Sequence, residues 1–315
     1  MYNSSTILFS SWIICILFLP CCMHRSQINL QRIIVPKWFA TSDPPKSETP
    51  PPINIWIHGT LFVRKQYFYQ SIGPIQELHK IKTFHDSFHI REIGNTLNQR
   101  DPINFPLETL YAFGWSGNLN AYERLQAAKN LYNQLQELIK QYIEEWGVYP
   151  VIRIITHSHG GNVALYLAFV DQAKQEHLVI DTLLMLACPV QTNTMHFADN
   201  SVFKNVYSLY SSLDLIQVIA PQRFNEKLPF SSREFPRHFN VIQARVRLNG
   251  HALLHTEFTS RSFISSIPLL LKELAMVKEN KLHLHKKRIV LHITTSRALL
   301  HKQAKRHLPI QKNSP

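Results

Sequence analysis

The chain has 315 residues and carries 34 Lys and Arg against 21 Asp and Glu, a formal net charge of +13. Hydrophobic residues make up 45% and charged residues only 17%, so a sizeable core can be buried, and a disordered or coiled-coil protein is excluded. Nine glycines also exclude a collagen-like or glycine-rich chain.

The N-terminus is a candidate membrane segment. Residues 7–19 (ILFSSWIICILFL) are nearly all apolar, and no Lys, Arg, Asp or Glu occurs in residues 1–24. With its uncharged flanks the run just reaches the length needed to span a bilayer. Arg25, Arg32 and Lys37 follow it, and this charge would keep the rest of the chain on the cytoplasmic side. We expect a membrane anchor, with a cleaved signal peptide, giving a secreted or periplasmic body, or a buried helix as alternatives.

Three further segments follow this run. Residues 25–52 are a basic and then proline-rich linker, since residues 41–52 (TSDPPKSETPPP) favour extended backbone and oppose a helix. Residues 53–278 have the size of one folded domain. Residues 279–315 form a tail with nine Lys and Arg against one acid.

Strands and helices alternate along the body. Strands are expected over residues 53–58, 109–115, 151–156, 181–187, 205–210 and 240–248, and helices over residues 121–146, 162–174 and 262–278. Strands separated by helices imply parallel crossovers. The pattern predicts an α/β fold, with a doubly wound, mostly parallel sheet and helices on both faces.

A long insertion, residues 61–108, separates the first two expected strands. It interleaves aromatic and basic residues. Long ordered connections are usually functional, so it is a candidate acyl-binding wall or lid. The alternative is a set of helices that merely cover the sheet.

The clearest chemical signal is residues 156–161 (THSHGG), between an expected strand and an expected helix. A nucleophile elbow needs this setting, because the sharp turn holds a serine hydroxyl above the sheet. Gly160 supplies a small residue two positions after Ser158, whereas Thr156 is larger than the residue usual two positions before it. An ordinary strand-to-helix turn is the alternative.

Two elements carry a resemblance to a known family: residues 115–117 (WSG) with Arg124, and residues 157–162 (HSHGGN). On these the sequence resembles the α/β-hydrolase family, most of all its bacterial lipases and esterases, from residue 53 to about residue 278. The resemblance implies the α/β-hydrolase fold and ester hydrolysis by a serine. It says little about the substrate. Trp115 and Arg124 are expected to brace the insertion against the sheet.

The resemblance also implies an oxyanion hole after residues 57–60 (IHGT). Backbone N–H groups there would stabilise the negative charge of a tetrahedral intermediate. One donor is expected at His159, the residue after the serine. The other is expected at Thr60 or Leu61, and a plain tight turn is the alternative.

An activated serine needs a base and an acid, in the chain order Ser, acid, His. Asp214 lies just past an expected strand, where such an acid belongs, although a helix N-cap would also place it there. Asp181 and Asp199 are weaker rivals. His255 is the favoured base, because relatives often carry it in a His-x-acidic-apolar context, and His251 is the alternative base.

The other candidates are weaker. His157 and His159 are interpreted as packing and hydrogen-bonding residues, and no metal site is expected, because no Cys or acid lies at ligand spacing. Only Cys188 lies in the body, so the body has no disulfide of its own. The basic ends favour an anionic membrane surface over nucleic acid, with a solvated tail as the alternative.

The sequence therefore predicts a serine hydrolase that cleaves carboxylic esters with apolar acyl groups, either small molecules or lipids. The catalytic residues would be Ser158, Asp214 and His255, and no cofactor is expected. One alternative is an inactive hydrolase-fold protein that binds partners at a membrane. Another is an amidase or thioesterase with the same catalytic residues. The oligomeric state stays open.

Overall fold

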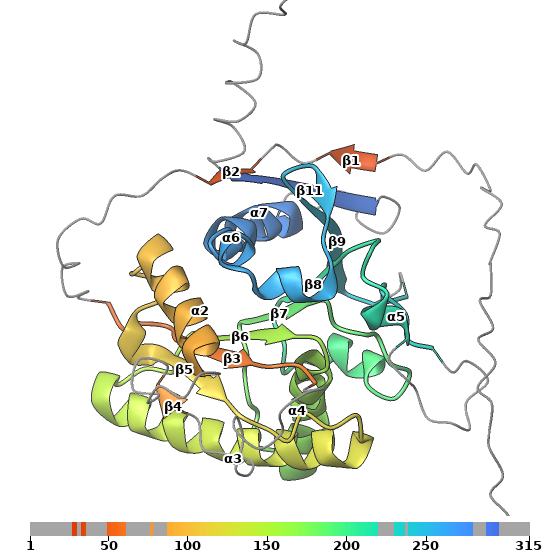
Figure 1. The fold of residues 1–315 in the computed structure, drawn as a ribbon. Helices are drawn as coiled ribbons and strands as arrows, with labels where there is room; N and C mark the ends of the chain where they lie inside the picture. The colour runs from red at the N-terminus through yellow and green to blue at the C-terminus, as the bar shows by residue number, and fades with distance from the viewer. Residues whose placement is uncertain are drawn as a thin grey trace, which may run out of the picture.

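A computed structural model of the protein describes residues 27–29, 33–35, 49–60, 76–77, 87–219, 230–236, 239–279 and 288–295. Within these ranges an 11-stranded sheet lies between two layers of helices (Figure 1). The strands are β1 (Gln27–Asn29), β2 (Ile33–Val35), β3 (Ile53–Ile57), β4 (Gln76–Glu77), β5 (Leu110–Phe113), β6 (Ile152–His157), β7 (Thr182–Leu186), β8 (Val206–Tyr210), β9 (Val241–Leu248), β10 (His251–Ala252) and β11 (Arg288–Thr295). The α-helices are α2 (Ser87–Arg100), α3 (Ala121–Trp146), α4 (Gly160–Lys174), α5 (Ile216–Ile219), α6 (Arg261–Ile264) and α7 (Ile267–Glu279), and 3₁₀ turns cover Leu107–Thr109, Met195–Asp199 and His255–Thr259.

The strand order shows where the direction of the connections reverses within the sheet. It runs β1-β11-β9-β8-β7-β6-β3-β5-β4, with β10 paired to β9 and β2 to β11. All pairs are parallel except β4 with β5 and β10 with β9. From β3 the chain adds β5 on one side, then crosses to β6 on the other and continues outward. This reversal makes a topological switch point, and ligands of open α/β sheets bind beside the carboxyl ends of the strands at such a point.

The predicted fold class is confirmed, as are the six strands and the first two helices expected in the body. The expected helix over residues 121–146 has the bounds of α3, because sequence signals fix both ends. The side chain of Asn120 accepts a hydrogen bond from the N–H of Tyr122, and Gly147 ends the helix with a φ of 71°.

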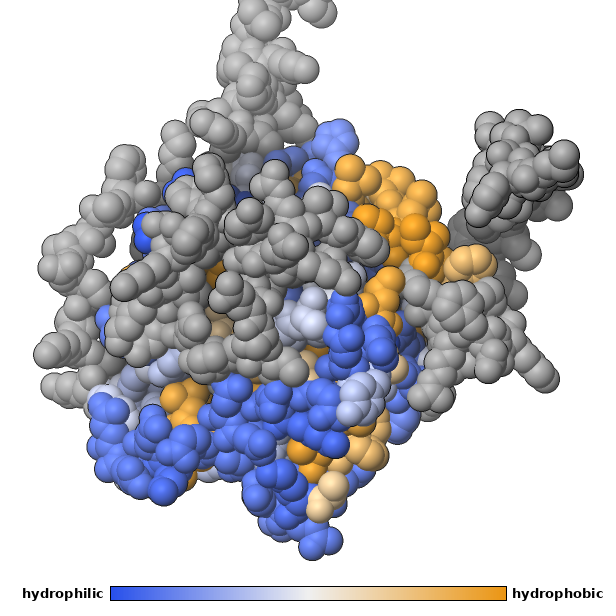
Figure 2. Space-filling view, turned by 60° about the horizontal axis from the view of Figure 1, so that its bottom comes forward, coloured by the Kyte–Doolittle hydropathy of each residue, from blue (hydrophilic) through white to orange (hydrophobic). Residues whose placement is uncertain are grey.

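Two apolar clusters hold the layers together. One packs α3 and α4 on the first face of the sheet, and the other packs α2, α6 and α7 on the second. All five residues of β3 are buried, as expected for a central parallel strand covered on both faces. The helix α3 leaves its polar side outward, and Figure 2, which brings this side forward, shows mainly hydrophilic residues among the coloured atoms.

The sheet extends beyond the expected body. In the segment expected as a tail, β11 pairs in parallel with β9, and its other edge pairs with β1 and β2 from the segment expected as a linker. These pairings bring strands of the expected linker and of the expected tail to one sheet edge. The apolar run of residues 7–19 lies outside the described residues. Among those that are described, no helix combines the length and apolar character needed to cross a membrane.

The helix expected over residues 262–278 is two helices. The chain leaves α6 after Ile264 and starts α7 at Ile267, so that Pro268 lies in the first turn of α7. Proline is tolerated there because the first N–H groups of a helix have no partner within it. Within the insertion over residues 61–108, α2 is a helix that covers the sheet, which is the alternative to an acyl-binding wall or lid. Residues 61–75 and 78–86 of the insertion lie outside the described residues.

Candidate active site

Ser158 lies at a strained turn between β6 and α4. Its φ is 52°, a left-handed value that a non-glycine residue rarely adopts, and strain of this kind concentrates at functional sites. Its N–H donates to the carbonyl of Leu186 on β7 (2.8 Å), and its own carbonyl accepts from the N–H of Gly161 (3.0 Å). The serine is therefore fixed from both sides at the carboxyl end of the sheet. Thr156, two residues earlier, is fully buried within β6.

Glycines let neighbouring chain segments approach this turn. A Cβ atom on Gly59 would lie 2.6 Å from the Cβ of Ser158, so the turn after β3 touches the serine directly. A Cβ on Gly160 would lie 2.7 Å from the carbonyl oxygen of Ile57 and 2.6 Å from that of His58. The start of α4 thus packs against the end of β3, which requires glycine at residue 160.

We expect Gly160→Ala to lower the free energy of unfolding by about 1–3 kcal/mol, because the new methyl group meets backbone oxygens that cannot turn away. Denaturant titration measures the change. Gly161→Ala provides a control, since its methyl group would meet the side chain of Cys188 instead. A Cys188→Ala background should recover part of the Gly161→Ala loss and none of the Gly160→Ala loss. Equal recovery in both would contradict this packing.

The structure brings the expected acid and the favoured base together. The Nδ1 atom of His255 lies 2.8 Å from Oδ2 of Asp214, and the Asp214 side chain is fully buried. The second carboxylate oxygen, Oδ1, accepts from the N–H of Gln217 in α5 (3.0 Å). Asp214 therefore contacts His255 and caps a helix at the same time, so both interpretations of this residue describe real contacts.

The rival residues lie elsewhere. His251 is exposed in β10. Asp181 accepts from the N–H of Ile152 at the start of β6 and pairs with Lys204, at the amino edge of the sheet. Asp199 accepts from the N–H of Asn240. None of these contacts leads to Ser158.

The ring of His157 connects the base to the elbow. The rings of His157 and His255 have centroids 4.7 Å apart, and His157 directly precedes Ser158. The order along the chain is thus a serine on a strand-to-helix turn after β6, an acid after β8 and a histidine after β9, all at the carboxyl edge of a sheet with a central switch point.

The chain has the α/β-hydrolase fold. No protein-family model matches the sequence, and no curated protein matches it either. Solved structures that resemble this hydrolase fold include an arylesterase (12% identity, 73% of this chain and 78% of that chain, TM-score 0.40). Others are an esterase of Pyrobaculum calidifontis (11%, 73% and 79%, 0.41) and a thermophilic carboxylesterase cloned from a metagenomic library (13%, 75% and 80%, 0.35). At such low identities and TM-scores, nothing about the activity of this chain follows from them.

In this hydrolase fold the expected oxyanion donors border the serine. His159 is the N-cap of α4, and no described residue accepts a hydrogen bond from its N–H, as expected at a helix start. Thr60 follows Gly59, which touches Ser158, and its hydroxyl is buried with no partner among the described residues. Leu61, the other position expected for the second donor, lies outside the described residues.

A buried polar network supports the elbow from below. Asn162 donates to the carbonyl of Pro189 (3.0 Å), and Arg124 donates to Gln191 (2.9 Å) and to the carbonyl of Leu119 (3.0 Å). The bonds to Pro189 and Gln191 reach the segment after β7. Sequence reasoning missed the pair of Arg124 and Gln191, because nothing local marks residues 67 positions apart as partners. Arg124 therefore braces α3 against that segment.

Neighbouring titratable groups are held neutral. Burial lowers the pKa of His159 to about 3, with the charges of Arg124 and His255 adding to the effect. Burial raises the pKa of Cys188 to about 12, so its thiol stays protonated and is a poor nucleophile. Among the described residues, no three His, Cys, Asp or Glu side chains are grouped as a metal site would require.

His58 fixes the turn before the expected oxyanion position. Its Nδ1 donates to the carbonyl of Gly59 (2.6 Å), and its Nε2 accepts from the N–H of Trp115 (3.2 Å). The indole N–H of Trp115 donates in turn to the carbonyl of His58 (2.8 Å), and the two rings stack. Burial lowers the pKa of His58 from 6.5 to about 4. Both ring contacts fit the neutral form.

His58 makes stability depend on pH. The unfolded chain takes up a proton on this histidine below about pH 6.5, whereas the folded protein resists it until about pH 4. The stability from neutral His58 is therefore present above pH 6.5 and lost as the pH falls toward 4, by up to about 3 kcal/mol. Denaturant titration of His58→Gln should show a shallower loss over this range. His251→Gln, at an exposed site, should keep the wild-type slope. A wild-type slope in His58→Gln would contradict the assignment.

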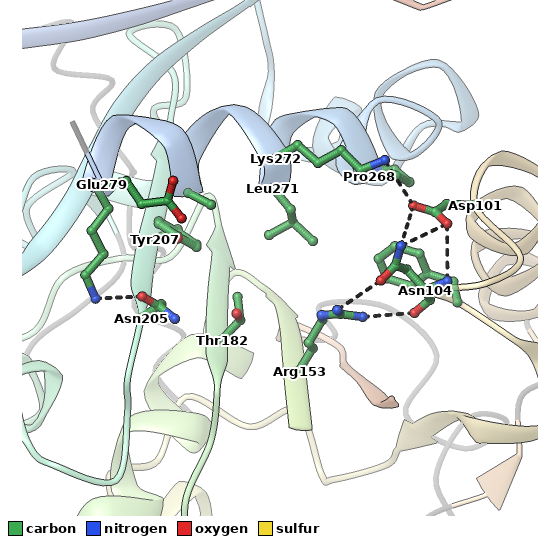
Figure 3. A pocket seen from close by; sticks show the side chains of 13 residues that line it. Asp101, Asn104, Arg153, Thr182, Asn205, Tyr207, Pro268, Leu271, Lys272 and Glu279 are labelled. Carbon is green, nitrogen blue, oxygen red and sulfur yellow. Dashed lines mark hydrogen bonds and ion pairs between the residues drawn. The ribbon is translucent and has the colours of Figure 1, made fainter. Parts of the chain in front are cut away.

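A cavity of about 580 Å³ lies at the opposite edge of the sheet, between α7 and the amino ends of the strands (Figure 3). Arg153 and Thr182 line it at the starts of β6 and β7, and Leu271 and Lys272 line it from α7. Ser158, Asp214 and His255 follow the carboxyl ends of their strands. This cavity is therefore not the place where the candidate active site would bind a substrate.

Proposed function

We propose that this protein is a serine hydrolase that cleaves carboxylic esters, with Ser158 as nucleophile, His255 as general base and Asp214 as the acid that orients it. The observation that supports it most directly is the 2.8 Å hydrogen bond between His255 and Asp214, residues 41 positions apart, beside the strained Ser158 turn. If His255 only packed in the core, it would not need a hydrogen bond to a buried carboxylate.

The proposed reaction has two steps, acylation of the serine and hydrolysis of the acyl-enzyme, and the same groups act in both. His255 takes the proton of the Ser158 hydroxyl through Nε2 while the serine oxygen attacks the ester carbonyl. Asp214 holds the Nδ1–H tautomer and stabilises the imidazolium that forms. His255 then gives the proton to the leaving alcohol. Water, activated by the same base, releases the acid from the acyl-enzyme.

The N–H of His159 and an N–H of the turn at Thr60 would hold the oxyanion. Such donors lower the barrier by several kcal/mol, because they are fixed before charge develops. The dipole of α4, whose first residue is Gly160, adds positive potential at the same place. No step requires a metal or an organic cofactor.

The surroundings favour an apolar acyl group. Leu213 and Leu215 flank Asp214 and are 55% and 67% exposed, and Leu254, beside His255, is 57% exposed. Ile216 and Ile219 on α5 are also exposed. Exposed apolar side chains next to the proposed acid and base in the sequence favour an apolar ligand there.

A panel of matched substrates tests the proposal. Nitrophenyl esters of increasing acyl length should be hydrolysed, with longer acyl chains preferred to acetate, and the matched anilides should be hydrolysed far more slowly. A thioester series separates an esterase from a thioesterase. Preference for the anilides, or no turnover of any ester by folded protein, would overturn the proposed function.

A further inference from the structure

The residue before the nucleophile contacts the base directly. The Nε2 atom of His157 lies 3.0 Å from the backbone carbonyl oxygen of His255, and the two rings lie against each other at an angle of 49°. A carbonyl oxygen only accepts, so Nε2 of His157 is the donor, and its ring carries the proton there. This bond joins residues 98 positions apart.

The other side of His157 faces the oxyanion turn. A Cβ atom on Gly59 would lie 3.2 Å from Nδ1 of His157 and 3.1 Å from its carbonyl oxygen. The ring is thus held between the turn at Gly59 and the turn at His255, and its backbone leads straight into Ser158. One side chain therefore contacts or adjoins all three parts of the candidate site.

The chain around His255 is held both by apolar packing and by polar contacts. Leu253 and Phe258 are buried in the apolar cluster of the second face, and β10 pairs with β9. His255 opens a 3₁₀ turn, which Glu257 caps by accepting from the N–H of Leu254 (2.6 Å), a contact within the turn itself. The bond to Asp214 fixes the Nδ1 atom of the His255 ring. Asp214 itself belongs to a different segment, next to α5. The bond from His157 fixes the backbone of His255 to the end of β6, the strand that leads into Ser158.

We propose that His157 is a positioning residue, which holds the backbone of His255 in register with Ser158 so that the imidazole reaches the serine hydroxyl. This inference rests on the proposed function. Proton transfer requires the nucleophile and base within hydrogen-bond reach, and a displacement of about 1 Å can cost up to about 100-fold in rate. The contribution of His157 should thus appear in kcat and leave substrate affinity nearly unchanged.

Four variants separate the donor from the ring. His157→Gln keeps an N–H donor at similar reach, His157→Phe keeps the ring without the donor, and His157→Asn keeps an amide that is too short to reach the carbonyl. His196→Phe, at an exposed site, is the matched control. Each variant is measured for kcat and KM on the best ester, for the rate at which a fluorophosphonate probe labels the protein, and for its thermal midpoint.

We expect kcat to fall by about 10- to 100-fold in His157→Phe and His157→Asn, with KM within about threefold of wild type, and most of the loss to be recovered in His157→Gln. Probe labelling should slow in parallel. If His157→Phe does not fold, the difference in kcat between His157→Asn and His157→Gln still tests the inference. Wild-type kcat in the Phe or Asn variant, an equal loss in Gln, or a change in KM alone would overturn the inference.

These outcomes are distinct from failure of the proposed function. If wild type hydrolyses esters and is labelled at Ser158, but the His157 variants behave as wild type, only the positioning role fails. If folded wild type neither turns over any ester nor reacts with the probe, the proposed function fails and this inference fails with it.

Discussion

Ser158→Ala is expected to reduce ester hydrolysis by on the order of 10⁴-fold or more, because it removes the hydroxyl that would form the acyl-enzyme. Cys188, a free thiol beside the elbow, is buried and stays protonated. The variant keeps the backbone, so KM for the best ester should change little. Steady-state kinetics on wild type and variant, purified in parallel, measure the effect. A loss of less than tenfold would mean that the serine is not the nucleophile.

A glycine at the same position separates chemistry from strain. Ser158→Gly removes the hydroxyl as Ser158→Ala does, but glycine adopts a φ of 52° without steric cost. We expect both variants to be inactive, with the glycine variant more stable than the alanine variant by about 1 kcal/mol. Denaturant titration gives the difference. Alanine being the more stable of the two would contradict the strained turn.

Asp214→Asn is expected to lower kcat by about 10⁴-fold while leaving the fold intact. The amide oxygen can still accept from the N–H of Gln217, so the cap of α5 survives. The amide nitrogen would then face His255 as a donor, which favours the tautomer with the proton on Nε2. In that tautomer Nε2 cannot accept the serine proton, and catalysis loses its base.

Asp199→Asn is the matched control, since Asp199 also accepts a backbone hydrogen bond but lies apart from the serine. It should keep wild-type kcat. Asp214→Asn should match its thermal midpoint to within a few degrees. If Asp214→Asn keeps more than a tenth of wild-type kcat, the acid has been misassigned.

Much of the fold follows from local signals. The helix α3 could be predicted to the residue, because Asn120 and Gly147 mark its two ends. The central strands could be predicted because buried parallel strands are continuous apolar runs between polar turns. The break between α6 and α7 could not, since the apolar pattern continues across it and only the position of Pro268 hints at a new start.

The outer edge of the sheet shows why other elements escape prediction. The strands β1 and β2 are three residues each, too short for a pattern to be recognised. The alternation in β11 is weak and lies within a basic segment, where charge suggests a solvated tail. These strands exist through pairing with one another and with β9, which a single stretch of sequence does not encode.

Some residues of the candidate site could be predicted from the sequence and others could not. Ser158 could be proposed from its motif, and Asp214 from its place after a strand. Spacing alone left His251 and His255 as rivals, because the path of the loop decides which ring meets the carboxylate. The contact of His157 with His255 could not be foreseen at all, since it joins a strand end to a distant turn.

The most direct test of the account is where a fluorophosphonate probe attaches to the full-length protein, read by mass spectrometry of its peptides. We predict one label per chain, on Ser158, with none in Ser158→Ala and slow labelling in Asp214→Asn and His255→Ala. A label on another residue, labelling that persists in Ser158→Ala, or folded wild type that takes up no label would contradict the account.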